Sequence, residues 1–465
     1  MELLSHSPDF NGILDDKRLE RRAHLLSQSL LSGRSSSVHA VTRSEAEQKG
    51  FYRFLNNDRV SEDQLITELT RRCSSNVSGR DVLVIQDSSS IGLSQHRNRI
   101  QADSGAGLVG NKIGLGFLSH TSLVLDADRE TILGIADLQL WHRTEDKANN
   151  TTRLYKRQPI EEKESFKWIK ASNCIRTDLQ NAKSITIIQD REGDIYEQFC
   201  LIDDEKTNLI IRSRDNRCLE NGNRLYQALS SSEKLGSYTI EVYGDLRKEK
   251  ISRIAHVEVR AVPVNIKNPK VGKSSNLPES LCLYAVEVIE TTPGIKQPLC
   301  WRLLTTIKTE TFEDAVAIIK RYKQRWYIEQ LFRLLKKQGY QIEESQLTTG
   351  WAIRKLFVLI VGSAVRIMQL YLSYNREECQ STNEVFSIEE IECLESIEKK
   401  HIKTSEKTNN PYLKEKLSWA CWIIARLGGW KGNQKQRPPG PILIKEGLEK
   451  FEMIFQGWKL AKQLL

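Results

Sequence analysis

The stretch VLVIQD, residues 82–87, and its near copy ITIIQD, residues 185–190, decide the expected fold. Each is a short apolar run typical of a buried strand, and each closes with Gln-Asp. Between them the sequence predicts two further strands, at 117–125 and 131–140, and a helix over 161–181. A strand meander followed by a helix and another strand indicates a mixed sheet in an α/β domain.

Asp87 and Asp190 end these two runs. In open α/β sheets, ligand-binding side chains collect at such strand ends. Taken singly, each Asp is more readily explained as a turn residue that closes a strand. Two adjacent carboxylates would repel each other, however, and a hard divalent cation relieves that repulsion. The pair therefore predicts a metal site if the two strands lie side by side.

A third carboxylate, Glu329, is expected on one helix with Tyr322, Arg325 and Lys336. At about 100° per residue, the four side chains fall within an arc of about 60°. A solvated salt-bridge face would repeat Glu and Lys at i, i+4, and this face does not. Residues 321–340 hold six Lys and Arg against one acid, which suits a phosphate backbone. Three carboxylates at such a site indicate two-metal phosphoryl transfer, in which one ion activates the attacking oxygen and the other stabilises the leaving oxygen.

Composition narrows the class of protein. The chain has 465 residues, 39% of them hydrophobic, and a formal charge of +9, which suggests two to four domains and permits a polyanion partner. Its nine cysteines form no C-x-x-C pair, so neither a disulfide framework nor a zinc ribbon is expected. The longest apolar run, 356–367, contains Arg366 and is too short to span a membrane.

Changes in pattern along the chain predict three parts. Residues 1–72 form an N-terminal helical domain, residues 73–375 a catalytic α/β domain, and residues 376–465 a C-terminal helical domain. The catalytic domain contains a strand-rich insertion at 206–305. Between residues 205 and 275 there are 14 Lys and Arg against 8 Asp and Glu, so basic charge gathers there.

The spacing Tyr322-x2-Arg325-x3-Glu329-x6-Lys336 resembles the YREK motif of bacterial DDE transposases, insertion-sequence enzymes that cut DNA through a hairpin intermediate. The sequence DREGDIY at 190–196 resembles the second-Asp motif of that family. Asp87-Ser88-Ser89 resembles its first, where the family often has Thr after the Asp. Residues 49–60 and the LGGW sequence at 427–430 resemble the family's terminal segments. The resemblance implies an RNase H-like catalytic core with a β-strand insertion, flanked by helical domains.

The resemblance also implies roles for individual residues. Asp87, Asp190 and Glu329 would be the catalytic ligands of two Mg²⁺ or Mn²⁺ ions per active site. An exposed Trp301 would stack on a flipped base, a contact of about 1–3 kcal/mol, although a core Trp on a strand is the alternative. The remaining DNA contacts would come from basic and phenolic side chains: Tyr322, Arg325 and Lys336 on phosphates, Arg212 and Arg214 near the transposon end, and Lys17, Arg18 and Arg53 for end recognition.

The reaction so implied is cut-and-paste transposition. Each transposon end is nicked, the freed 3′-hydroxyl makes a hairpin, the hairpin is hydrolysed, and the ends join target DNA. The partners would be inverted-repeat end DNA and target DNA, with a homodimer in the synaptic complex. We expect a cytoplasmic, nucleoid-associated bacterial protein without a membrane span. Two alternatives stay open: an RNase H-like structure-selective nuclease, and a catalytically silent DNA-binding regulator of transposition.

Overall fold

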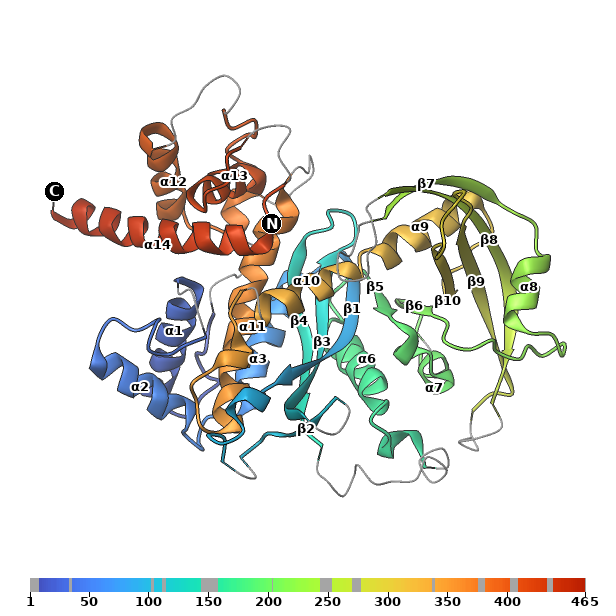
Figure 1. Cartoon of the computed structure of the whole chain (residues 1–465), viewed down its shortest axis with the longest axis horizontal. Coiled ribbons are helices and arrows are strands. Elements are labelled where there is room, and N and C mark those ends of the chain that lie inside the picture. Colours follow the sequence, from blue (N-terminus) through green and yellow to red (C-terminus); the bar gives the residue numbers. More distant parts are fainter. Residues whose placement is uncertain are drawn as a thin grey trace.

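The computed structural model describes residues 8–32, 36–101, 104–110, 114–143, 158–202, 204–242, 253–269, 277–336, 339–374, 381–401, 409–432 and 438–464. One large sheet runs through the molecule, with the N- and C-terminal helices gathered at one end and the strand-rich insertion at the other (Figure 1). The candidate catalytic residues lie along the middle of this sheet and on the helices that cover it.

The central part of the sheet has the strand order β4-β3-β1-β5-β6. Strand β3 is antiparallel to both β1 and β4, whereas β5 and β6 run parallel to β1. A three-stranded meander joined through a helix to two parallel strands is the RNase H-like arrangement, which confirms the predicted fold class. The strands are β1 (Asp81–Gly92), β3 (Gly114–Asp126), β4 (Ile132–Trp141), β5 (Ser184–Gln189) and β6 (Thr207–Arg212), with the short β2 (Gly107–Val109) paired to β3.

Strand β1 is longer than predicted. The sequence indicated that it ends at Asp87, but it continues to Gly92, so Asp87 lies inside the strand. The antiparallel pairing with β3 extends from Val82–Asp126 to Gly92–Gly116 and gives the polar residues after Asp87 backbone partners. Strand β5, by contrast, ends at Gln189, directly before Asp190, as predicted.

The insertion continues the same sheet. Strand β10 (Cys300–Thr305) pairs antiparallel with β6, and the order then runs β10-β9-β8-β7 to the far edge. Basic and aromatic residues of β6 and β10 therefore lie where the core sheet meets the added strands. The other elements are α8 (Leu225–Ser231), β7 (Gly236–Val242), β8 (Arg253–Lys267) and β9 (Ser280–Glu290).

Alternating side chains of the strands fill two apolar clusters. Val82 and Val84 face α6 (Phe166–Asp178) and α7 (Tyr196–Cys200). Leu83 and Ile85 belong to the cluster on the other face, with α9 (Phe312–Lys323), α10 (Trp326–Leu335) and α11 (Gly350–Ser373). Because residues 82–85 are buried on both faces, this part of β1 reads as a continuous apolar run.

Helix α11 runs between the terminal helices and the central sheet (Figure 1). Among the described helices it alone is long and apolar enough to cross a membrane. It extends beyond the apolar run 356–367 at both ends and includes Arg354 and Lys355 before that run. In its most apolar window, 89% is buried inside the protein, as expected for a core helix.

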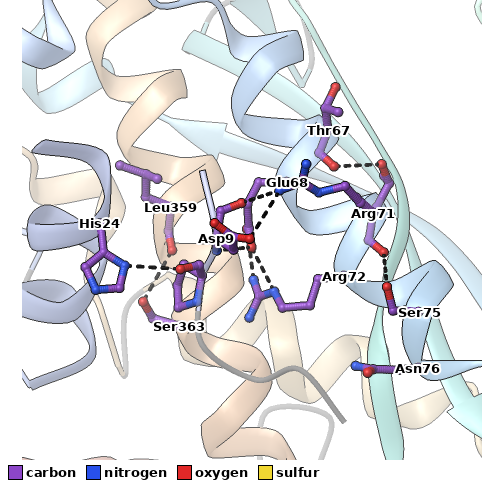
Figure 2. Close-up of polar contacts among 12 residues, drawn as sticks. Asp9, His24, Thr67, Glu68, Arg71, Arg72, Ser75, Asn76, Leu359 and Ser363 are labelled. Carbon is purple, nitrogen blue, oxygen red and sulfur yellow. Dashed lines mark hydrogen bonds and ion pairs between the residues drawn. The ribbon is translucent and has the colours of Figure 1, made fainter. Parts of the chain in front are cut away.

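The terminal helices pack around α11. The N-terminal helices are α1 (Lys17–Ser32), α2 (Glu45–Leu55) and α3 (Glu62–Asn76). Figure 2 shows how the N-terminal segment is attached: Glu68 of α3 accepts a hydrogen bond from the Asp9 backbone at 3.1 Å and pairs with Arg72 at 3.0 Å. The C-terminal helices are α12 (Ile388–His401), α13 (Leu417–Leu427) and α14 (Pro441–Leu464).

Candidate active site

Asp87 and Asp190 stand on neighbouring parallel strands. Strands β1 and β5 pair as far as Ile85 opposite Ile188, two residues before Asp87 and Asp190, and the two carboxylates are close enough for Asp190 to raise the pKa of Asp87. Asp190 follows the end of β5 and caps a short 3₁₀ turn, Arg191–Gly193, by accepting a hydrogen bond from the Glu192 backbone at 2.8 Å. The repeated Gln-Asp sequence therefore lies inside β1 and at the end of β5, and the charge of Asp190 contributes to the raised pKa of Asp87.

Glu329 does not share one continuous helix with Tyr322, so that prediction was wrong. Helix α9 ends at Lys323, α10 begins at Trp326, and Arg325 lies between them. Backbone bonds of the i to i−3 type, such as Arg325 N to Tyr322 O at 3.0 Å, replace the regular helical pattern at this junction. Lys336 likewise lies just beyond the last residue of α10, half-buried. The four side chains therefore do not lie on one face of a single helix.

Arg325 joins two of the three carboxylates. Its guanidinium donates to Asp87 Oδ2 at 3.0 Å and to Glu329 Oε1. The side chain is only 20% exposed. Burial lowers the pKa of Arg325, but Tyr322, Asp87 and Glu329 raise it by more, so the net shift is upward and the group stays charged. The contact links residues 238 positions apart and fixes α10 against β1.

The surroundings of Asp87 disfavour the charged form of its carboxyl group. Burial, with smaller contributions from Asp190 and Glu329, raises its pKa to about 7. Arg325 and the Ser88 backbone N–H, which donates to Asp87 at 2.8 Å, act in the opposite direction. A carboxyl group that is half-protonated near neutral pH among other carboxylates is typical of a functional site.

The three carboxylates are suitable ligands for a divalent cation. As the side chains stand, no group of three or more His, Cys, Asp or Glu residues in the described part of the chain is arranged to hold a metal ion. Arg325 instead supplies the positive charge that Asp87 and Glu329 need. Carboxylate oxygens are the ligands that Mg²⁺ and Mn²⁺ prefer. The donor set therefore fits such an ion once the guanidinium has moved aside.

An aromatic cluster lies next to Arg325. Tyr322 is 4% exposed, and the Trp301 ring packs against it edge to face, with 5.4 Å between the two ring centroids. Burial raises the pKa of Tyr322, while Arg325 and Arg212 oppose this rise. Arg212 also donates to the Cys300 carbonyl at 3.1 Å, which ties β6 to β10. Trp301 is half-buried rather than exposed, because Tyr322 covers part of its ring.

The other basic residues from the sequence lie outside this group. Arg214 is exposed and pairs with Asp215 at 3.0 Å. Lys17, Arg18 and Arg53 are exposed on α1 and α2, at the opposite end of the molecule from the insertion (Figure 1). The structure therefore brings Tyr322, Arg325, Trp301 and Arg212 to the carboxylates and leaves the N-terminal cations apart from them.

Sequence reasoning did not assign the residues behind the catalytic strands. His120 of β3 bonds Ser88 Oγ through Nδ1 at 2.9 Å and packs edge to face on Trp168 at 4.5 Å. It is completely buried, which lowers its pKa, so it is a neutral structural group at physiological pH. Gln86 and Gln189 are buried as well, and their only signal in the sequence was the repeated Ile-Gln-Asp.

Two family models match the chain. The model of the transposase DDE domain matches residues 127–365, more than half of the chain, and that of the transposase DNA-binding region matches residues 11–60. Asp190 and Glu329 fall within the first match, whereas Asp87 joins them through the geometry. Among solved structures, a cryo-EM synaptic complex of piggyBac transposase with hairpin DNA is 9% identical over 96% of this chain and 72% of that chain, with a TM-score of 0.38. A likeness of this size supports no conclusion about this protein.

Proposed function

This chain belongs to the DDE transposase family, and from that premise we propose that it is a cut-and-paste DNA transposase of the YREK, hairpin-forming class. The observation that carries the proposal is the contact of Arg325 with both Asp87 and Glu329, beside Asp190. It supports a single centre built from three carboxylates that are far apart in the sequence.

We propose that Asp87, Asp190 and Glu329 hold Mg²⁺ or Mn²⁺, two ions per active site. Divalent metal ions are general in this family. When bound, they would activate the attacking water or 3′-hydroxyl and stabilise the leaving oxygen. Asp87, with its pKa near 7, must lose its proton before it can serve as a ligand.

Arg325 would then act on the DNA. A guanidinium forms paired hydrogen bonds equally well with a carboxylate and with a phosphate. Once its contacts with Asp87 and Glu329 are released, Arg325 is placed to hold the scissile phosphate against the three carboxylates. Lys336 at the end of α10 and Arg212 on β6 would extend this phosphate-binding surface, with Arg214 further out.

The aromatic cluster supports hairpin formation. Trp301 lies against Tyr322, which in turn neighbours Arg325 and Asp190. A base that leaves the helix at the cleaved end could stack on Trp301 if Tyr322 shifted, and flipping relieves the strain of a tight hairpin. We expect Trp301→Ala to slow hairpin formation by about 10-fold or more, since stacking contributes about 1–3 kcal/mol, with nicking less affected.

End recognition and assembly are assigned to the terminal helices. The exposed Lys17, Arg18 and Arg53 lie on α1 and α2, within the matched transposase DNA-binding region. We propose that they contact inverted-repeat DNA in the bacterial cytoplasm, on the nucleoid. We also propose that the helices from α12 onward support a homodimer that bridges two ends before the complex joins target DNA.

The experiment uses the purified protein, Mg²⁺ and a labelled fragment that carries the inverted repeat of its element. On a denaturing gel we expect a nicked strand, then a hairpin that runs as one strand of double length, then joined products with a target plasmid. Cleavage without a hairpin or joined products would indicate the structure-selective nuclease. DNA binding without any cleavage would indicate the silent regulator, and either result would overturn the proposal.

A further inference from the structure

We propose that Gln86 and Gln189 are positioning residues that fix the spacing between Asp87 and Asp190. The inference rests on the proposed function, because the spacing matters when the two carboxylates share metal ions. Each glutamine immediately precedes one of the aspartates, and both side chains are 0% exposed. Neither contacts DNA or metal in this proposal; both act through the aspartates.

The two glutamines bond to each other where the backbone ladder stops. The parallel pairing of β1 with β5 ends at Ile85 and Ile188. One residue further along, Gln189 Nε2 donates to Gln86 Oε1 at 2.8 Å. Because successive side chains of a strand point to opposite faces, the glutamines lie on the α6 face and the aspartates on the other. This hydrogen bond between the two side-chain amides therefore links β1 and β5 beyond their last backbone pair, directly before the two carboxylates.

Ser172 of α6 anchors this pair to the rest of the core. Gln86 Nε2 donates to Ser172 Oγ at 3.3 Å, and Ser172 Oγ donates to the Trp168 carbonyl at 2.9 Å. Gln198 of α7 donates to the same Ser172 oxygen at 2.8 Å. Ser172 and Gln198 are each 1% exposed, so the network is sealed from solvent. Hydrogen bonds in such a low-dielectric setting are strong and hold their members in one arrangement.

The turn after Asp190 packs directly onto Gln189. Gly193 ends the 3₁₀ turn that Asp190 caps, and a Cβ atom at this position would lie 2.4 Å from Gln189 Oε1 and 2.7 Å from its Cβ. Only a residue without a side chain allows this approach. A shift of the Gln189 amide would therefore move the turn and, with it, the carboxylate of Asp190.

A purely structural role explains this network less well. The side-chain oxygens of Gln189 and Gln198 are buried without a hydrogen-bond partner. Unpaired buried amide oxygens weaken a fold, and apolar residues of the same size would avoid that penalty. What the amides provide and apolar residues cannot is a directional link between the ends of β1 and β5. Two like charges at those ends would otherwise push the strands apart.

The test compares the double variant Gln86→Leu/Gln189→Leu with the control Gln198→Leu. The double variant removes the amides beside the aspartates, whereas the control removes an amide from the same network away from them. Binding of Mn²⁺ is measured from the EPR signal of free Mn²⁺, with end DNA present. The half-saturating Mg²⁺ concentration for nicking is measured in parallel, with end-DNA affinity as the check on folding.

We expect the double variant to bind Mn²⁺ about 10-fold more weakly and to need about 10-fold more Mg²⁺, with unchanged DNA affinity. The control Gln198→Leu should keep a Mn²⁺ affinity and a half-saturating Mg²⁺ concentration within about 2-fold of the wild-type values. Equal metal affinity in the double variant and the wild type, or equal weakening in the control, would overturn the inference. If the double variant does not fold, Gln189→Met is measured instead, and the same outcomes decide. Absence of metal-dependent nicking in the wild type would instead refute the proposed function.

Discussion

Replacement of Asp87 by Asn should stabilise the metal-free protein at alkaline pH. Burial raises the pKa of Asp87 from 3.8 to about 7, so the folded state holds this proton more tightly than the unfolded chain does. When folding raises the pKa of a group, that group stabilises the folded state most at a pH below its pKa in the unfolded chain. This stabilisation is lost as the pH rises through the pKa of the group in the folded state. The loss falls between about pH 4 and pH 7, and Asn, which never ionises, escapes it.

The size of the effect follows from the shift. Three pKa units at 1.36 kcal/mol each correspond to roughly 4 kcal/mol above pH 7. The Asp87 side chain is only 18% exposed, so solvent screens this effect little. With an unfolding entropy of about 2 cal/mol/K per residue, a chain of this length would gain about 4 °C in melting temperature.

The assay is thermal unfolding without divalent ions at pH 5 and pH 8.5. Asp87→Asn should exceed the wild type by a few degrees at pH 8.5 and by less than half as much at pH 5. The matched control is Asp128→Asn, on an exposed turn residue, which should change little at either pH. A gain that is equal at both pH values, or no gain at pH 8.5, would refute the electrostatic account of Asp87.

Three further predictions follow from the same contacts. Without metal, Arg325→Gln should lower the free energy of unfolding in urea by about 2–3 kcal/mol, because the carboxylates it bridges then repel each other. Added Mn²⁺ should restore part of this loss, and a variant as stable as the wild type would contradict the bridge. The half-saturating Mg²⁺ concentration for nicking should rise as the pH falls below 7, since Asp87 must lose its proton; a flat profile between pH 6 and 8 would disprove this. Gly193→Ala should destabilise the protein by about 1–3 kcal/mol through its clash with Gln189, whereas Gly457→Ala, with open space around it, should not.

Much of the core could be predicted from apolar patterns. The strands near 82–85, 117–125, 131–140 and 185–189 were found because buried strands leave short apolar runs between turn residues. The end of β1 could not be found in this way. Its polar residues after Asp87 look like a turn, and only the long partner strand β3 keeps them extended.

The interruption between α9 and α10 could not be predicted from the sequence either. No glycine or proline separates Lys323 from Trp326, so the sequence favours one continuous helix. Tertiary packing buries Tyr322 on one side of the junction and Ile328 on the other. Local propensity is a weak guide where packing competes with it.

The candidate site was predicted in part. The shared Gln-Asp sequence indicated the two aspartates, and the charged pattern around Glu329, together with the family resemblance, indicated the third carboxylate. The bridging role of Arg325 could not be predicted, because its contact with Asp87 spans 238 residues and depends on the finished fold. The partial burial of Trp301 behind Tyr322 is likewise a property of how β10 meets α9.

The measurement that tests the central claim most directly is nicking of end DNA in Mg²⁺ by three single variants. These are Asp87→Asn, Asp190→Asn and Glu329→Gln, each first shown to bind the end DNA as the wild type does. If the three carboxylates form one metal-dependent centre, nicking falls to background in every variant and in wild-type protein treated with EDTA. Nicking at the wild-type rate in any one variant, or in EDTA, would contradict the account.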